Sequence, residues 1–367
     1  MVPLNWPLQA PPPQDMRWLQ VEDASAVPAC RQAVQVLAER LGFPAARIGQ
    51  LALAVTEAAS NLHKHAVQGS LLLCVNRDGP QPGIDLVTID AGPGVRDVSA
   101  AVRDGHSTAG TLGIGLGAIQ RLADFCDLYS LAGRGTSLVA RFRAVPAGGD
   151  DPPHTPPALG GAARPPKPPW PPEIGGAARP SWAGLIRPIT GETECGDAYG
   201  AVQVGGAVIA VLCDGLGHGP LAAAAAAEGV AAVLEAPAGE PAALLERVHQ
   251  RMGRTRGGAV GVVHIDGQRA RFAGLGNVAA SIVSGGERKS MISLPGIAGH
   301  QARAIRQFEY EVPPGAAVIL HSDGISSRWE AAALPGIAAR DPLLIAAVLL
   351  AAAGVHRDDA GILVLKP

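Results

Sequence analysis

The chain has 367 residues, of which 47% are hydrophobic and 17% charged, and its formal net charge is -2. This length and composition predict two or three globular domains with full cores. The sequence has no Lys/Arg run, and its longest apolar stretch, 343–355, is shorter than the roughly 20 residues that a membrane helix needs. We therefore expect a cytoplasmic protein with neither a nucleic-acid nor a membrane partner.

The first 16 residues are rich in proline, and we expect them to be irregular. Apolar periodicity predicts a helix over 27–40 and a second helix that begins near Ala45. Glu57 and Asn61 are four residues apart on the second helix, so they project from the same side. An amide oxygen can hold Mg²⁺ and a carboxylate can deprotonate a nucleophile, although such a pair alone could equally be solvated polar residues on an amphipathic helix.

Two strands are predicted next, over 71–77 and 84–90, and they read as an antiparallel pair. The second strand ends in the turn Asp90-Ala91-Gly92-Pro93-Gly94. An aspartate at this point can accept a hydrogen bond from the amino group of an adenine, and the glycines leave room for the ring. A second hairpin is predicted further on, from CDLYSL and TSLVARFR around 133–135.

Between these hairpins lies DGHSTAGTLGIGLGAIQRLAD, residues 104–124, in which a glycine-rich loop runs into a helix from Leu116. Glycines let backbone N–H groups approach phosphate oxygens, and the amino end of a helix favours an anion. The loop also fits a dinucleotide-binding pattern, but no buried strand precedes it and no acid follows at the required distance. The lysine of the P-loop is missing as well, and a plain glycine-rich surface loop is the remaining alternative.

Taken in order, these motifs resemble the N, G1 and G2 boxes of the GHKL ATPase/kinase superfamily, and within it the RsbT-type serine kinases of bacterial partner switching. The resemblance covers residues 17–143 and implies a GHKL (Bergerat) α/β sandwich that binds ATP and Mg²⁺. It implies that Glu57 is the catalytic base, Asn61 the Mg²⁺ ligand and Asp90 the adenine reader. The remaining nucleotide contacts that it implies are Gly92, Gly94, Gly110, Thr111, Gly113, Gly115, Gly117 and Thr136.

Three further residues flank Asn61 on the same helix. Lys64 and His65 are candidates for contacts to phosphate, and we interpret His63 as structural.

Residues 144–180 consist largely of Pro, Gly and Ala, which predicts an extended linker that spaces two domains without fixing them. The C-terminal domain, 181–367, alternates strand patterns with helices predicted over 220–236, 241–254 and 343–354.

Acidic residues in this second domain occur at strand ends or in glycine-flanked turns. They are Asp197, Asp214, Asp323 and the pair Asp358-Asp359. One such aspartate is typical of a turn, but if the fold gathers all of them, their repulsion would require divalent cations. A set of oxygen ligands suits Mg²⁺ or Mn²⁺ rather than zinc, and two such ions could activate a water for attack on phosphorus.

DGLGHG and HSDG carry a second resemblance, to the metal-dependent protein Ser/Thr phosphatases (PPM) in their SpoIIE-like branch, closest in size to the RsbX type. It implies a PPM-type α/β/β/α sandwich with two Mn²⁺ or Mg²⁺ ions. Asp214 would be the catalytic carboxylate that bridges both metals and Gly215 a carbonyl ligand. The further implied ligands are Asp197, Asp323 and Asp358, with Asp359 as the alternative to Asp358.

This sequence departs from the eukaryotic relatives, which carry a histidine where Leu216 stands, so we interpret His218 as structural.

We therefore expect a two-domain α/β protein of partner-switching signalling, in which a serine/threonine kinase and a phosphatase act on a STAS-domain regulator. One alternative is a module that binds a STAS protein or sigma factor under ATP control without phosphorylating it; the presence of Glu57 argues against this. The other alternative is a pseudophosphatase scaffold, against which the complete set of acidic ligands argues.

Overall fold

The computed structural model describes residues 8–77, 81–95, 115–144 and 181–367. Its N-terminal part is built on a five-stranded antiparallel sheet with the strand order β2-β3-β4-β6-β5. The strands are β2 (Met16–Gln20), β3 (Ser70–Asn76), β4 (Gly83–Ile89), β5 (Phe125–Ser130) and β6 (Thr136–Arg143). The pairing of β3 with β4 and of β5 with β6 confirms both predicted hairpins.

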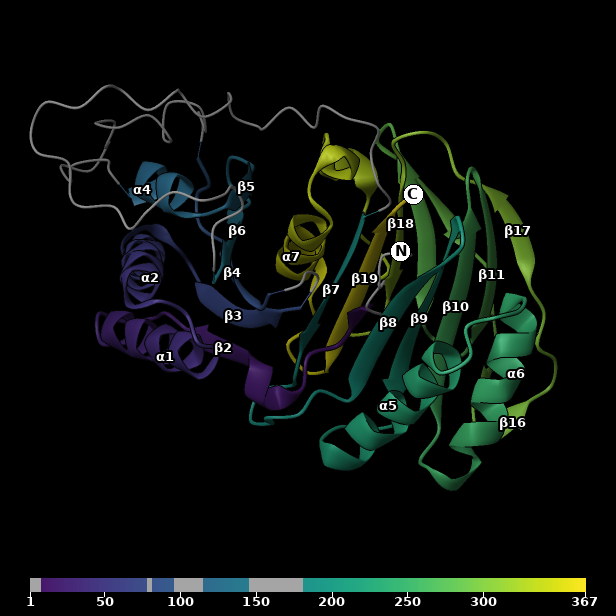
Figure 1. Cartoon of the computed structure of the whole chain (residues 1–367). Coiled ribbons are helices and arrows are strands. Elements are labelled where there is room, and N and C mark those ends of the chain that lie inside the picture. The colour runs from purple at the N-terminus through teal and green to yellow at the C-terminus, as the bar shows by residue number, and fades with distance from the viewer. Residues whose placement is uncertain (1–7, 78–80, 96–114, 145–180) are drawn as a thin grey trace, which may run out of the picture.

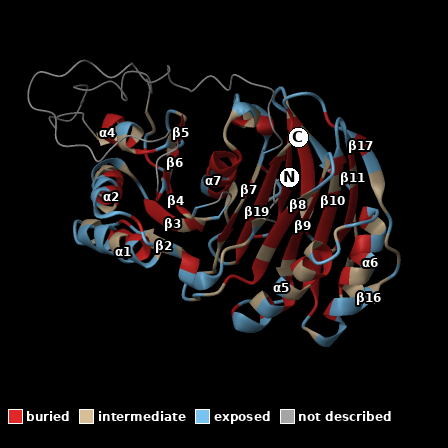
Figure 2. Ribbon diagram, in the orientation of Figure 1, coloured by how far each residue is buried: buried red, intermediate tan, exposed pale blue. Residues whose placement is uncertain are grey.

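Three helices cover one face of this sheet: α1 (Ala26–Arg40), α2 (Ala45–His65) and α4 (Gly115–Leu122). Their apolar stripes enclose a core with the inward residues of the sheet, and Leu51, Val55 and Ile119 are fully buried there. The outward faces of α1 and α2 remain exposed (Figure 2). Amphipathic spacing thus decides which side of each helix meets the sheet.

Two further sheets form the C-terminal part (Figure 1). The first has the order β1-β8-β9-β10-β11-β14, with β17 also paired to β11. Its strands are β1 (Leu8–Gln9), β8 (Asp197–Val204), β9 (Ala207–Gly215), β10 (Gly258–Asp266), β11 (Arg269–Leu275), β14 (Ser293–Leu294) and β17 (Phe308–Glu311). The second has the order β13-β12-β18-β19-β7. Its strands are β7 (Ser181–Arg187), β12 (Ala279–Ser284), β13 (Glu287–Met291), β18 (Ala317–His321) and β19 (Ala360–Lys366).

Helices flank both of these sheets. α5 (Pro220–Leu234) and α6 (Pro241–Arg251) pack on the outer face of the first sheet, and α7 (Pro342–Ala353) packs on β7 and β19 of the second. The inner faces meet in a core that contains Phe272. This α/β/β/α arrangement agrees with the fold class predicted from the sequence. A small hairpin, β15 (Gly296–Ile297) with β16 (Gln301–Ala302), and four 3₁₀ turns (Pro13–Asp15, Met252–Arg254, Ala331–Ala333 and Ile337–Ala339) complete the elements.

The linker predicted over 144–180 lies, apart from Ala144, outside the described residues. The two parts that it joins are nevertheless in contact, which differs from the expectation of domains that are spaced without being fixed. The open face of the N-terminal sheet packs against α7, so that α7 lies between two sheets from different parts of the chain (Figure 1). Leu72, Val87 and Val139 of the N-terminal sheet share one apolar cluster with α7, β7 and β19. Composition indicated a tether, but it could not reveal that each part leaves an apolar surface for the other.

The first described residues, from Leu8 on, also join the C-terminal part. We expected residues 1–16 to be irregular, whereas Leu8 and Gln9 form β1 and pair with Ala201 and Gly200 of β8. The indole N–H of Trp18 on β2 donates to the backbone carbonyl of Ile186 on β7, at 3.0 Å. From Leu8 on, the chain therefore passes through one sheet of the C-terminal part before it enters the N-terminal sheet.

Within the described ranges, no helix is both long and apolar enough to cross a membrane. All five cysteines are free thiols, and Cys30, Cys126, Cys195 and Cys213 are buried.

Candidate functional sites

The first candidate site centres on α2, where Glu57 and Asn61 are both half-buried. Gly115, the first residue of α4, lies directly against them. A Cβ at Gly115 would stand 3.0 Å from Nδ2 of Asn61 and 3.1 Å from Oε2 of Glu57. The glycine thus allows the amino end of α4 to approach the carboxylate and the amide, which brings three predicted residues into one place.

Asp90, at the end of β4, forms the second half of this site. Its Oδ1 accepts a hydrogen bond from the backbone N–H of Gly92 at 2.7 Å, and its own N–H donates to the carbonyl of Thr136 at 3.1 Å. Burial raises the pKa of the Asp90 carboxyl, and the hydrogen bonds from Gly92 and Thr136 oppose this shift. A desolvated acceptor held in this way is suited to an amino group in a flat ring.

The Asp90 turn packs on the β5–β6 hairpin through two glycines with positive φ. Gly94 has φ +68° and Gly135 has φ +85°. A Cβ on Gly135 would lie 1.9 Å from the carbonyl oxygen of Asp90, and one on Gly94 would lie 2.2 Å from that of Leu131. Both positions therefore need glycine for space as well as for conformation.

The same turn also touches the carboxyl end of α2. The N–H of Ala91 donates to the carbonyl of Val67 at 2.9 Å, and a Cβ on Gly92 would lie 2.9 Å from the carbonyl of His65. This contact places Asp90 beside the helix that carries Glu57 and Asn61.

The structure places the remaining predicted residues of this site as follows. Gly110, Thr111 and Gly113 lie outside the described residues, and Gly117 is buried within α4. The side chains of His63, Lys64 and His65 are exposed at the end of α2, and their role in binding phosphate stays a prediction. Thr136 begins β6, and its hydroxyl lies 2.9 Å from that of Ser130.

The second candidate site is acidic and lies at one end of the first C-terminal sheet. Asp197 on β8 and Asp214 on β9 are directly paired across the antiparallel ladder. Asp197 is 2% exposed. Its Oδ2 accepts a hydrogen bond from the hydroxyl of Ser322 at 2.6 Å, and that hydroxyl in turn accepts one from the N–H of Gly361 at 2.9 Å. Ser322 thus fixes Asp197 from the second sheet.

Asp323 follows Ser322 and is exposed. Its Oδ2 accepts a hydrogen bond from the side-chain amide of Asn277 at 2.5 Å. Although the residue as a whole is exposed, partial desolvation of its carboxyl group and the charge of Asp358 raise the pKa of Asp323. Asp323 therefore faces the same acidic region as Asp358.

The two aspartates at the start of β19 have different surroundings. The Asp359 carboxylate is 3% exposed and accepts backbone N–H bonds from Ile189 at 2.7 Å and from Gly196 at 2.9 Å. Asp358 is half-buried, and its Oδ1 accepts a bond from the N–H of Asp359. With both Asp359 oxygens engaged by backbone, Asp358 remains the ligand candidate that we favour.

The electrostatics of this cluster are unfavourable without a cation. Burial, followed by the charges of Asp323, Asp358 and Asp359, raises the pKa of Asp214 to about 7. Burial and the charge of Asp214 raise the pKa of Asp197. Such mutual repulsion is what a bound divalent cation would relieve.

Oxygen donors of this kind fit Mg²⁺ or Mn²⁺. In the described part of the chain, however, no three His, Cys, Asp or Glu side chains are already gathered closely enough to hold a metal ion. The carboxylates are near enough to interact electrostatically. Their side chains would have to move closer together to bind a metal ion. His218 lies at the edge of this region, where it is exposed and its Nδ1 lies 2.9 Å from Oε1 of Glu192.

Sequence reasoning missed three residues that orient the acidic cluster: Ser322, Asn277 and Asp359 in its backbone-binding role. Ser322 stands beside Asp323 in HSDG, which gave a local signal. Asn277 and Asp359 gave none, because their partners are distant in the sequence.

Comparisons with known proteins agree with this division of the chain. Residues 20–142 match the histidine kinase-like ATPase domain family, and residues 204–366 match the stage II sporulation protein E (SpoIIE) family. A curated relative is the serine/threonine-protein kinase RsbT of Bacillus subtilis (strain 168), which is 35% identical over 112 residues, 30% of this chain and 84% of RsbT.

Solved structures similar to this chain include a protein from a study of the bacterial stressosome and RsbX in complex with magnesium. The first is 24% identical with a TM-score of 0.48, and it covers 52% of this chain and 100% of its own. RsbX is 20% identical with a TM-score of 0.46, and it covers 51% of this chain and 94% of its own.

Proposed function

From the membership of its N-terminal domain in the RsbT-like serine/threonine kinases and of its C-terminal domain in the SpoIIE-type protein phosphatases, we propose a function for the whole chain. It is a bifunctional enzyme of partner switching. It phosphorylates a serine or threonine of a STAS-domain regulator at the first site and removes the phosphate at the second. The observation that carries this proposal is that one chain holds both the Glu57–Asn61–Gly115 group and the cluster around Asp214.

In the kinase reaction, Glu57 takes the proton of the target hydroxyl as its oxygen bonds to the γ-phosphorus, and ADP leaves. Asp90 holds the adenine, and the amide oxygen of Asn61 would bind Mg²⁺. The contact of Gly115 with both α2 residues supports this assignment, because it brings the amino end of α4 to the reacting group. The bound Mg²⁺ would neutralise charge on the phosphates.

In the phosphatase reaction, water attacks the phosphorus of the phosphoester and releases the serine hydroxyl with inorganic phosphate. We propose Asp197, Asp214, Asp323, Asp358 and the carbonyl of Gly215 as ligands of two Mn²⁺ or Mg²⁺ ions, which would supply an activated water. Ser322 and Asn277 orient two of these carboxylates. Asp359 fixes the backbone before Asp197 through its bond with Gly196.

The STAS partner is proposed from the likeness to RsbT rather than from a surface of this chain. The test is to incubate the full chain with a candidate STAS protein, ATP, Mg²⁺ and Mn²⁺, and to follow phosphate occupancy by intact mass. Phosphate should appear with the Asp214→Asn variant and disappear again when wild type is added with ATP removed. A STAS protein that binds the chain but never gains mass would instead support the ATP-controlled binding module.

A further inference from the structure

We propose that the N-terminal domain is an intramolecular activator of the phosphatase, acting through α7. The sheet of the N-terminal domain supports α7, and α7 supports the two segments that carry Asp323 and Asp358. This inference rests on the proposed phosphatase function of the acidic site. The contacts at the middle of α7 and at each of its ends carry the argument.

The middle of α7 is buried from both sides. Every residue from Leu343 to Leu350 is buried, although only β7 and β19 of its own domain lie on one side. The other side packs against β4, β5 and β6 (Figures 1 and 2). A helix that is apolar all round needs cover on every side, so the N-terminal sheet completes the burial of this helix.

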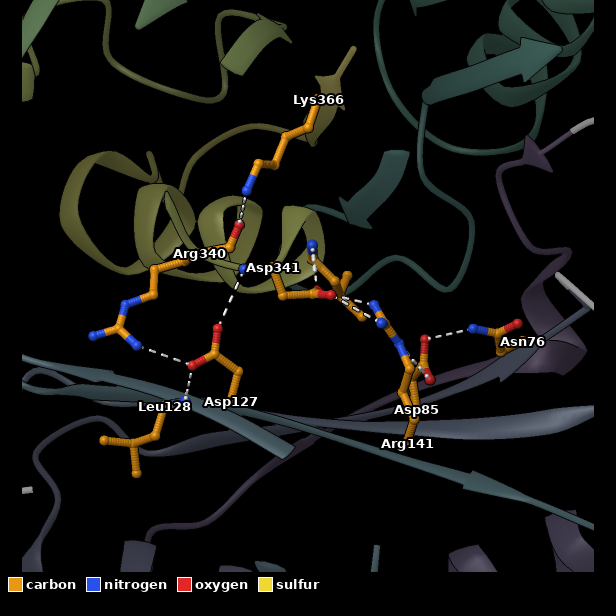
Figure 3. A network of polar contacts seen from close by, with 9 residues as sticks. Asn76, Asp85, Asp127, Leu128, Arg141, Arg340, Asp341 and Lys366 are labelled. Atoms are coloured by element: carbon orange, nitrogen blue, oxygen red, sulfur yellow. Dashed lines mark hydrogen bonds and ion pairs between the residues drawn. The ribbon is translucent and has the colours of Figure 1, made fainter. Parts of the chain in front are cut away.

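Residues of the N-terminal domain also hold the amino end of α7. Asp341 is the N-cap, and its Oδ1 accepts the N–H of Leu343 at 2.9 Å. Both carboxylate oxygens accept hydrogen bonds from the Arg141 guanidinium, each at 2.9 Å (Figure 3). Asp127 accepts bonds from the N–H of Asp341 and from the Arg340 side chain, both at 3.2 Å. The cap of a phosphatase helix is thus held by two residues of the other domain.

The carboxyl end of α7 is bonded to the Asp323 loop. The N–H of Ser326 donates to the carbonyl of Ala353 at 2.8 Å, and the N–H of Val355 donates to the carbonyl of Gly324 at 2.7 Å. Gly324 directly follows Asp323, and Gly354 begins the short connection to Asp358. A displacement of α7 would therefore move both candidate ligands.

Close packing leaves these segments little room to move independently of each other. A Cβ on Gly324 would lie 1.8 Å from the carbonyl oxygen of Asp359, so the two ligand-bearing segments are in backbone contact. Such packed elements shift together. Packing of the N-terminal sheet against α7 should therefore increase the affinity of the acidic site for Mn²⁺.

The experiment uses the full chain and measures Mn²⁺ binding by calorimetry with the metal alone, together with amide hydrogen exchange. Arg141→Glu places a like charge against Asp341 at the cap of α7. It should weaken Mn²⁺ binding by roughly 2- to 30-fold, the range in which residues along a coupling route act. The variant should also speed hydrogen exchange of the Val355 amide, which is bonded to the carbonyl of Gly324. Arg141→Lys, which keeps a positive charge beside Asp341 and leaves the Asp341 cap in place, should retain most of both quantities.

Arg251→Gln is the matched control, because it breaks ion pairs with Glu228 and Glu235 away from α7 and should change neither quantity. Val139→Asp is a second variant, which puts a charge beside α7 in the buried face of the sheet.

Faster exchange in α7 with unchanged Mn²⁺ affinity would overturn the proposal. So would undisturbed exchange in α7 for both variants, because the sheet would then not support the helix. If Arg141→Glu weakens Mn²⁺ binding as expected but the wild type hydrolyses no phosphoprotein, the proposed phosphatase function fails while the coupling between the two domains stands.

Discussion

The two sites of this chain achieve their shapes through opposite chemistry. Around Asp214, carboxylates from different strands approach until their charges repel, and side-chain hydrogen bonds from Ser322 and Asn277 hold them in place. Around Asp90, shape comes from the absence of side chains, because Gly94 and Gly135 admit backbone where a Cβ could not fit. Loss of one charged group should therefore dominate at the acidic site around Asp214, and added volume should matter at the nucleotide site around Asp90.

The largest effect is expected from Asp214→Asn. This change removes the carboxylate at the centre of the repelling cluster, so hydrolysis of a phosphoserine protein should fall to background. The metal-free variant should be at least as thermally stable as wild type, since like-charge repulsion is relieved. Phosphatase assays and thermal unfolding in EDTA measure both, with exposed Asp266→Asn as the control. Phosphatase turnover equal to that of wild type would contradict the assignment of Asp214 as a catalytic metal ligand.

Glu57→Ala should lower phosphoryl transfer by about 10²- to 10⁴-fold, the usual contribution of a general base. Nucleotide binding should persist, because the carboxylate acts on the incoming hydroxyl and not on the ground-state ligand. Single-turnover phosphorylation and equilibrium nucleotide titration separate the two quantities. Glu39→Ala, an exposed change on α1, is the comparison, and equal turnover in the two variants would contradict the assignment.

Asp90→Asn should weaken ATP binding by about 1.5–3 kcal/mol, the scale of a lost hydrogen bond to a charged group. The amide keeps the size of the carboxylate, so the turn should stay folded. Isothermal titration with a non-hydrolysable ATP analogue provides the measurement. Asp23→Asn, whose side chain accepts hydrogen bonds from the neighbouring Ser25, should leave affinity unchanged. Matching affinities for the two variants would count against an adenine contact at Asp90.

Gly135→Ala tests the opposite principle, in which one methyl group disturbs the nucleotide site. Overpacking against the Asp90 carbonyl should destabilise the domain by about 1–3 kcal/mol and lower ATP affinity. Gly133 is the matched control, because it has φ +75° with open space around its Cβ position. Gly133→Ala should show only the smaller conformational penalty in thermal unfolding. A Gly135→Ala protein as stable as Gly133→Ala would show that the close contact is not needed.

The fold class of both parts was predictable because their elements carry local patterns. Apolar or alternating runs predicted β3 and β4, apolar spacing predicted α2, and an unbroken apolar run predicted α7. The conjunction of Glu57 with Asn61 followed from helical spacing, and the acidic residues were recognisable at strand ends. These features depend on neighbours in the sequence, which a single sequence displays directly.

The association of the two parts was not predictable in the same way. Arg141 and Asp341 are 200 residues apart and each resembles an ordinary charged residue at the end of an element. The apolar run of α7 indicates that this helix is buried, but it does not indicate which other element packs against it. The same holds for Asn277, because only the folded chain brings its amide to Asp323.

The position of α7 near the end of the chain has a consequence for synthesis on the ribosome. The N-terminal sheet is complete once Arg143 has emerged, but the helix that covers its open face begins only at Pro342. About 200 residues separate them, which take roughly 10 to 40 s to translate. During that interval Leu72, Val87 and Val139 form an uncovered apolar surface on a nascent protein. That surface is where we expect a ribosome-associated chaperone to bind until the final helix arrives.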